Sequence, residues 1–167
     1  MSKISIFLTI VLSTLFFSAC APLAQNPDEF RAQFRDSTGM KSITVDKSYK
    51  KVRAQWLKNA NRCLHKRINI IGGGFGTTYQ DYTPKVIEKS GKMVLSVQWH
   101  MKDLVTAGGK APKDGVYLFV ADAIPQGKKK TRIDFYFSPT WDTTDAILKA
   151  VTAWSKGRDG CPVLVGK

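Results

Sequence analysis

Apolar side chains recur at steps of three and four between residues 49 and 64, which is the period of an amphipathic helix. The stripe is made of Tyr49, Val52, Trp56, Ala60 and Cys63, and it is widened by Leu57 and Leu64. Asp46 or Ser48 stands where such a helix needs an N-cap. The pattern therefore predicts a long helix that ends at about Lys66 and buries one face.

Two further helices are expected, a short one that starts after Asn26 and a longer one near the C-terminus. Asn26 is followed by a proline and two acids, which is a favourable helix start, and Phe30 and Phe34 give this short helix one apolar stripe. A longer helix is predicted over residues 142–155, and Gly157 is placed to end it. The core-facing residues of the longer helix are Ile147, Ala150, Val151 and Trp154.

Between these helices, apolar and polar residues alternate with the period of β-strands. The predicted strands cover residues 79–89, 93–101, 116–124 and about 131–137, with a brief strand around Ile43 and Val45. In 93–101 the odd positions from Met93 are apolar, whereas Ser96, Gln98 and His100 lie on the other face, which predicts a half-buried strand. Pro84 marks an edge or a bulge.

This order of helix, antiparallel meander and helix predicts an α+β fold arranged as a two-layer sandwich. We expect an antiparallel sheet of four to five strands that two main helices cover on one face. The other face would be open to solvent or to a partner. The layout resembles helix-grip and TATA-binding-protein-like domains, and this resemblance concerns the architecture alone.

The first twenty residues have the features of an export signal. Lys3 precedes an apolar stretch from residue 4 to 17, which is shorter than the roughly 20 residues that a membrane-spanning helix needs. The stretch Phe17-Ser18-Ala19-Cys20 resembles the lipobox of bacterial lipoproteins, although Phe17 replaces the usual Leu. The resemblance implies cleavage before Cys20 and acylation of that residue. The alternative is an ordinary secretory signal that is cleaved after Ala19 or Ala21.

The lipoprotein resemblance divides the chain into three parts. Residues 1–19 would be the signal peptide, 20–25 the lipidated cysteine with its linker, and 26–167 one domain. Two or three acyl chains make a stable membrane anchor, whereas one chain binds only marginally. Because Ala21 rather than Asp follows Cys20, the enterobacterial sorting rule implies the outer membrane, facing the periplasm.

With Cys20 lipidated, two cysteines remain, Cys63 and Cys161. An even pair in an exported chain predicts one disulfide bond, and two free buried thiols are the alternative. Cys63 and His65 alone are too few ligands for a metal site, and we expect no metal or cofactor.

The charge balance adds a candidate binding surface. Lys and Arg number 26 against 13 acids, and removal of the signal would leave a side-chain charge of +12 on the domain. The residues singled out for contact with an anionic surface are Lys50, Lys51, Arg53, Lys58 and Arg62 on the outer face of the long helix, together with Lys128, Lys129, Lys130 and Arg132 at a hairpin. The alternative is a solvated helix face and a charged turn that prevents edge aggregation.

An anionic partner in the envelope would be a lipid headgroup, a lipopolysaccharide phosphate or an acidic protein. Nucleic acid fits the charge, but the anchor places the domain outside the cytoplasm, and no nucleic-acid-binding motif is present. We therefore expect contact with the membrane through the anchor and no nucleic-acid partner.

Catalytic motifs are absent from the sequence. The glycine run from Gly72 to Gly76 lacks the spacing and the lysine of a phosphate-binding loop, so a loop or bulge is expected there, with Phe75 as a potential exposed anchor. His65 and His100 have no local nucleophile motif. Four aspartates could pair across strands as acids or balance nearby lysines, namely Asp81, Asp103, Asp122 and Asp134.

The sequence therefore favours a non-catalytic envelope lipoprotein, an accessory or assembly subunit that binds a protein or an anionic envelope component. The alternative is a lipoprotein that binds a lipid or small ligand between its helices and its sheet. A cavity of several hundred cubic ångströms in that space would favour the second role, and a filled core the first.

Overall fold

The computed structural model describes residues 22–72, 76–101, 112–139 and 142–164. Its helices are α2 (Pro27–Phe34), α3 (Tyr49–Leu64) and α4 (Asp142–Ser155), and its strands are β1 (Met40–Val45), β2 (Lys66–Gly72), β3 (Gly76–Lys89), β4 (Lys92–Met101), β5 (Val116–Gln126) and β6 (Lys130–Phe137). The lipobox-like residues, including Cys20, lie outside the described residues, as do Phe75 and Asp103.

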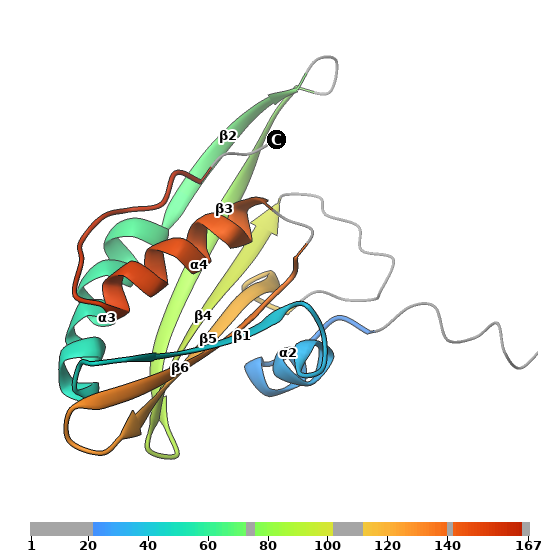
Figure 1. The fold of residues 1–167 in the computed structure, drawn as a ribbon. Coiled ribbons are helices and arrows are strands. Elements are labelled where there is room, and N and C mark those ends of the chain that lie inside the picture. Colours follow the sequence, from blue (N-terminus) through green and yellow to red (C-terminus); the bar gives the residue numbers. More distant parts are fainter. Residues whose placement is uncertain (1–21, 73–75, 102–111, 140–141, 165–167) are drawn as a thin grey trace, which may run out of the picture.

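The strands form one antiparallel sheet of six strands in the order β1-β6-β5-β4-β3-β2 (Figure 1). The fold is thus α+β with an antiparallel sheet, as predicted, but the expected count of four to five strands is too low. The additional strand is β2, which starts directly after α3. Its apolar run Ile68–Ile71 pairs with β3 up to the Gly72–Gly76 position, so the glycine run joins the two strands of a hairpin.

Pro84 lies in β3 at a place where the sheet tolerates a missing N–H group. β2 pairs with β3 only as far as Tyr82, whereas the pairing of β3 with β4 continues through Pro84 opposite Val97. Beyond Tyr82, one side of β3 is therefore a free edge, where proline removes no ladder hydrogen bond.

One face of the sheet carries α3 and α4, and the opposite face carries α2 (Figure 1). The main core between the long helices and the sheet contains Trp56, Trp154, Phe119 and Phe135, each with no exposed surface. Trp56, Phe119 and Phe135 line none of the pockets found among the described residues, so the space between the helices and the sheet is filled by packing at these side chains.

The prediction of a two-layer sandwich is wrong, because α2 packs on the middle of the second sheet face, while Ile87 and Arg132 stay exposed. Phe30 of α2 is 3% exposed and packs in a second cluster with Val94, Val120 and Tyr136. Its ring centroid lies 4.8 Å from that of Phe34. β4 is consequently buried on both faces, with residues 94, 96 and 98 at most 5% exposed, rather than half-buried. The structure has three layers, because the apolar stripe of the short N-terminal helix requires a surface to cover.

Candidate anion-binding surface

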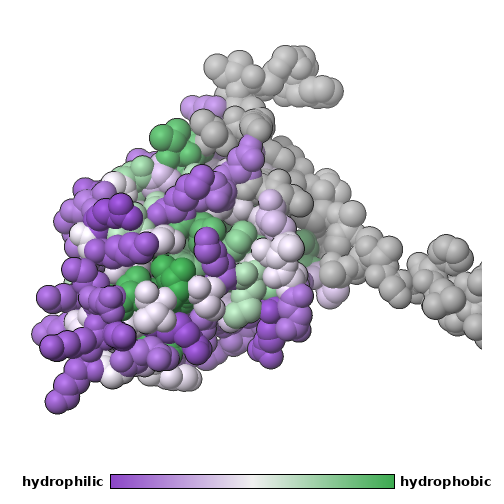
Figure 2. Space-filling model, in the orientation of Figure 1, coloured by the Kyte–Doolittle hydropathy of each residue, from purple (hydrophilic) through white to green (hydrophobic). Residues whose placement is uncertain are grey.

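The two basic segments found in the sequence meet at one end of the domain. β1 pairs with β6 in a register that places Val45 opposite Thr131. The buried Thr131 hydroxyl donates a hydrogen bond of 2.8 Å to the backbone carbonyl of Lys47, just before α3 begins. The lysine-rich β5–β6 turn therefore lies beside the first turn of α3 (Figure 1). Figure 2 shows hydrophilic side chains crowding this end of the molecule. We call this region the basic end and define it by Lys47, Lys50, Lys51, Lys128, Lys129 and Lys130.

The structure separates the nine predicted contact residues into two groups. Five of them have an acidic or amide partner within the domain, in the contacts Arg53–Glu88 at 3.3 Å, Lys58–Asp159 at 2.9 Å, Arg62–Asn59 at 2.7 Å, Lys130–Asp46 at 3.9 Å and Arg132–Asp134 at 3.1 Å. The other four, Lys50, Lys51, Lys128 and Lys129, are exposed and form no ion pair with a described residue. Among the nine, Arg62 has only a neutral amide as its partner, and the four lysines without an ion pair to a described residue all lie at the basic end.

The N-terminus of α3 differs from those of the other two helices. Ser48 is the N-cap, but its side chain makes no capping hydrogen bond, and the first turn contains no acidic residue. By contrast, α2 and α4 both carry acids in their first turns. The first turn of α3 therefore offers no negative side chain of its own to the positive end of the helix dipole, although Glu88 binds Tyr49 and Asp46 lies 3.9 Å from Lys130.

A groove separates the start of α3 from the end of α4. Its volume is about 330 Å³, and its lining comprises Lys47, Lys51, Ala54, Gln55, Lys58, Trp154, Ser155 and Gly157. Lys47 lies over Gly157, since a β-carbon placed on this glycine would be 3.8 Å from the Lys47 Nζ atom. Gly157 follows the C-terminus of α4, where a cation is favoured by the helix dipole. The groove lining contains no acidic residue.

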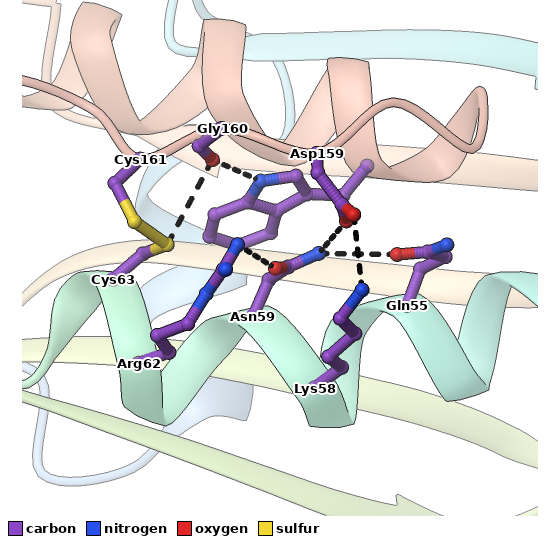
Figure 3. The surroundings of a disulfide bond; sticks show 9 residues. Gln55, Lys58, Asn59, Arg62, Cys63, Asp159, Gly160 and Cys161 are labelled. Atoms are coloured by element: carbon purple, nitrogen blue, oxygen red, sulfur yellow. Dashed lines mark hydrogen bonds and ion pairs between the residues drawn. A yellow bond between two sulfur atoms is a disulfide. The ribbon is translucent and has the colours of Figure 1, made fainter.

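The C-terminal segment forms one side of this region and is attached by the disulfide bond (Figure 3). The sulfur atoms of Cys63 and Cys161 are 2.01 Å apart, and the bond spans 98 residues of sequence. The Trp154 indole Nε1 donates a hydrogen bond of 2.7 Å to the Gly160 carbonyl. Together these contacts hold the segment that carries Asp159 against both long helices.

Asp159 binds two side chains of α3. It accepts hydrogen bonds from the Lys58 ammonium at 2.9 Å and from the Asn59 amide at 3.2 Å (Figure 3). The hydrogen bond from Lys58 is the largest cause that lowers the pKa of the Asp159 carboxyl, and the Asn59 bond adds to it. Lys58 is thereby held in place at the rim of the groove.

The remaining acid and base candidates lie elsewhere. Arg67, in β2, binds Asp81 through two hydrogen bonds of 2.7 and 2.9 Å and lies over the Tyr79 ring. This hydrogen bonding is the main reason that the pKa of Asp81 is lowered. His100 is opposite Asp81 on β4, but no hydrogen bond joins it to a described hydroxyl or thiol group. His65 is exposed after α3.

Asp122 was named in the sequence as an acid that pairs across strands or balances a nearby lysine, but its contact with α2 was not predicted. Arg31, 6% exposed, donates a hydrogen bond of 2.6 Å to Asp122, which is 2% exposed and also binds Lys92 at 2.6 Å. Asp122 lies directly opposite Asp134 in the β5–β6 ladder. A possible signal was Asp122 itself, an acid inside an otherwise apolar strand. Because its oxygens are occupied by two cations, the cluster attaches α2 to the sheet.

No protein-family model matches the chain, and a search of curated proteins finds no match. Two solved structures of norcoclaurine synthase from Thalictrum flavum are similar to it. A point mutant in complex with a transition-state analogue aligns with a TM-score of 0.32 and 16% identity over 70% of this chain and 90% of that one. The complex with dopamine and hydroxybenzaldehyde aligns with a TM-score of 0.31 and 16% identity over 70% and 83%. A likeness at this level carries no conclusion about activity.

None of the described helices is long and apolar enough to span a bilayer. Within the same residues, no group of three or more His, Cys, Asp or Glu side chains is arranged to hold a metal ion.

Proposed function

We propose that this protein is a non-catalytic envelope lipoprotein, anchored in the outer membrane through Cys20, that binds an acidic component of the envelope through its basic end. The observation that carries the binding role is the convergence of two distant basic segments, with Lys50, Lys51, Lys128 and Lys129 exposed and without an ion pair to any described residue. The anchor rests on the lipobox resemblance. The filled core around Trp56, Phe119 and Phe135 favours this role over a ligand pocket between helices and sheet.

The four unpaired lysines supply a useful binding energy. Each basic residue near an anionic surface contributes about 1 kcal/mol, so four contribute about 4 kcal/mol, or roughly a thousand-fold in affinity at low salt. Lysines that already bind an internal acid contribute less. Because the contacts are exposed, the attraction should weaken strongly as the ionic strength rises.

The position of the basic end supports a partner other than the lipids around the anchor. The described chain enters at Pro22, next to α2, and β1 then carries it toward the start of α3 (Figure 1). β1 has six residues, a length of about 17 Å along the strand. The basic end is thus displaced from the anchored side of the domain. We propose that it contacts an acidic protein or polysaccharide, or phosphorylated lipid of a facing surface.

The finer architecture is also a proposal. We propose a helix-grip-like layout rather than a TATA-binding-protein-like one. In support, β1 precedes α3 in the chain yet pairs with β6, the last strand of the meander, and α4 packs beside α3 on the same face of the sheet.

The binding role is tested with the full-length protein in an uncharged detergent. The test variant replaces Lys50, Lys51, Lys128 and Lys129 by Gln, and the control replaces Lys41, Lys66, Lys85 and Lys113, which changes the net charge equally. The probes are vesicles containing phosphatidylglycerol and purified lipopolysaccharide. We expect the test variant to lose most low-salt binding and the control to lose little. Equal binding by both variants would refute the role of the basic end.

The anchor is tested separately by fractionation of cells. Cys20→Ser should prevent lipidation and release the protein from the membrane fraction. Continued membrane retention of a normally processed Cys20→Ser protein would exclude the lipid anchor.

A further inference from the structure

We infer that the groove between α3 and α4 binds a single phosphomonoester group carried on a compact polar unit such as a sugar ring. This inference rests on the proposed function and assigns to part of the basic end a defined ligand chemistry. It depends on the groove lining, on the hydrogen-bonding groups that remain free there, and on the contact between Lys58 and Asp159 at the rim.

The charged residues that line the groove are all cations, namely Lys47, Lys51 and Lys58. Lys47 lies beside Gly157 and so offsets the negative end of the α4 dipole. The Gln55 side-chain oxygen already accepts a hydrogen bond of 3.1 Å from Asn59, which leaves its NH₂ group to face a ligand. A group with several negatively charged acceptor oxygens complements such a lining, and a phosphomonoester carries nearly two charges at neutral pH.

The Ser155 hydroxyl, which also lines the groove, is not free to bind a ligand. The Ser155 hydroxyl accepts a hydrogen bond of 3.0 Å from the Trp56 indole and donates one of 2.7 Å to the Val151 carbonyl. It is 1% exposed, so it forms part of the floor rather than a contact for a ligand.

The size and surface of the groove restrict what carries the phosphate. A volume of about 330 Å³ is near the lower end of the range of ligand sites, roughly 300–1,000 Å³, and suits one sugar-sized unit. Trp154 lines the groove but has no exposed surface, so its indole face is not available for stacking on a base. The lining therefore favours a phosphorylated sugar over a nucleotide.

Asp159 competes with the ligand for Lys58. Its carboxylate binds the Lys58 ammonium at 2.9 Å from just outside the groove lining. A bound phosphate must share this ammonium with Asp159 or displace the carboxylate. Removing the Asp159 charge should therefore strengthen phosphate binding, by about three-fold or more for an exposed pair of this kind.

The test uses calorimetric titration of the full-length protein in an uncharged detergent with glucose 6-phosphate, glucuronate and glucose. The groove variant carries Lys47→Gln and Lys51→Gln, and its matched control carries Lys128→Gln and Lys129→Gln, at the same end but outside the groove. We expect the groove variant to lose about ten-fold or more in affinity for glucose 6-phosphate, and the control about two-fold or less, because only close charge-assisted contacts are strong.

A second pair of variants tests the competition at Lys58. Asp159→Asn should raise the affinity, whereas Asp145→Asn, which removes an acid paired with Lys149 on α4, should change it little. Equal gains from both variants would indicate a general charge effect and would overturn the assignment of the groove. Glucuronate binding as tight as that of glucose 6-phosphate would overturn the preference for phosphate.

The outcomes distinguish this inference from the proposed function. Equal losses by the groove variant and its control would refute the groove while leaving the basic end as a diffuse binding surface. Unchanged binding of glucose 6-phosphate in both variants would also refute the groove, whereas the proposed function is refuted only if the four-lysine variant and its control bind vesicles and lipopolysaccharide equally. For a lipid-borne source, purified lipopolysaccharide should compete with glucose 6-phosphate and lose this ability after phosphatase treatment; competition that survives dephosphorylation would overturn the phosphate assignment.

Discussion

The buried ion pair between Arg31 and Asp122 provides a direct test of how α2 is held on the sheet. Their side chains are only 7% and 2% exposed, and the Arg31 Nη2 atom lies 2.6 Å from an Asp122 oxygen. Replacing Arg31 by Met keeps most of the apolar stem and removes the charge. The Asp122 carboxylate then retains one cation, Lys92, also at 2.6 Å.

The expected cost follows from the burial of the acid that is left behind. Removing one partner of a fully buried pair destabilises a protein by about 3–5 kcal/mol, because the other charge stays buried without compensation. A single hydrogen bond to a charged group contributes about 1.5–3 kcal/mol. Since Lys92 continues to neutralise Asp122, we expect Arg31→Met to cost about 2–3 kcal/mol. The lost contact with Asp28 adds little, because Asp28 is 64% exposed.

Two measurements report this loss. Urea unfolding of the whole protein gives the change in global stability, and amide hydrogen exchange of residues 30–34 reports whether α2 detaches by itself. The control is Lys149→Gln, which breaks the exposed Lys149–Asp145 pair and should cost only about 0.3–0.5 kcal/mol. A double variant with Asp122→Asn should be less destabilised than the sum of the single changes.

A particular result would refute this reasoning. If Arg31→Met lowered stability by no more than Lys149→Gln and left the exchange of residues 30–34 unchanged, the ion pair would not hold α2. The apolar contacts of Phe30 would then account for the docking of the helix.

Three more predictions concern the disulfide, the C-terminal contact and two glycines. Replacing Cys63 and Cys161 by Ala should lower stability by about 4–5 kcal/mol, since the disulfide closes a loop of nearly a hundred residues. The melting temperature should then fall by roughly 10–15 °C. An unchanged melting curve would contradict this prediction. Because the pKa of the Asp159 carboxyl is lowered, its contribution to folding stability is present above about pH 4 and is lost as the pH falls through the lowered value. Asp159→Asn should therefore lose less stability than the wild type between pH 6 and pH 3. Urea midpoints that fall in parallel for the two proteins would refute this. Gly127 has φ +74° and open space around it, so Gly127→Ala should lower the free energy of unfolding by about 1–2 kcal/mol. Gly115 has φ +96°, and a β-carbon there would clash with the Trp99 backbone oxygen, so Gly115→Ala should cost at least about 1 kcal/mol more. Equal losses of stability would show that the backbone at Gly115 moves aside.

The helices were predictable because their periodic stripes are local. The stripe of α3 predicted a helix to about Lys66, and the structure ends it at Leu64. The 142–155 prediction coincides with α4. In both, side chains three and four residues apart share a face whatever the rest of the chain does. The strand β2 was missed because its apolar run is short and precedes a glycine segment, and its pairing depends on β3.

The binding surface was only partly predictable. A list of basic residues does not reveal which ones bind acids from distant segments. Lys58 binds Asp159, about a hundred residues later, and Arg53 binds Glu88 in β3. Lys47 precedes α3, and its place in the groove follows from its position beside Gly157 after α4.

The amino-acid sequence by itself determined the two main helices, the antiparallel strands and the excess of positive charge, since these depend on composition and on short-range periodicity; the export signal and lipobox stay predictions from resemblance. Only the tertiary structure decided that α2 packs on the second sheet face, that the two basic segments meet, and that four of the nine predicted residues have no ion pair with a described residue. The physical reason is that each of these facts requires contacts between segments far apart in the chain. Such contacts are set by strand register and by the packing of the whole domain.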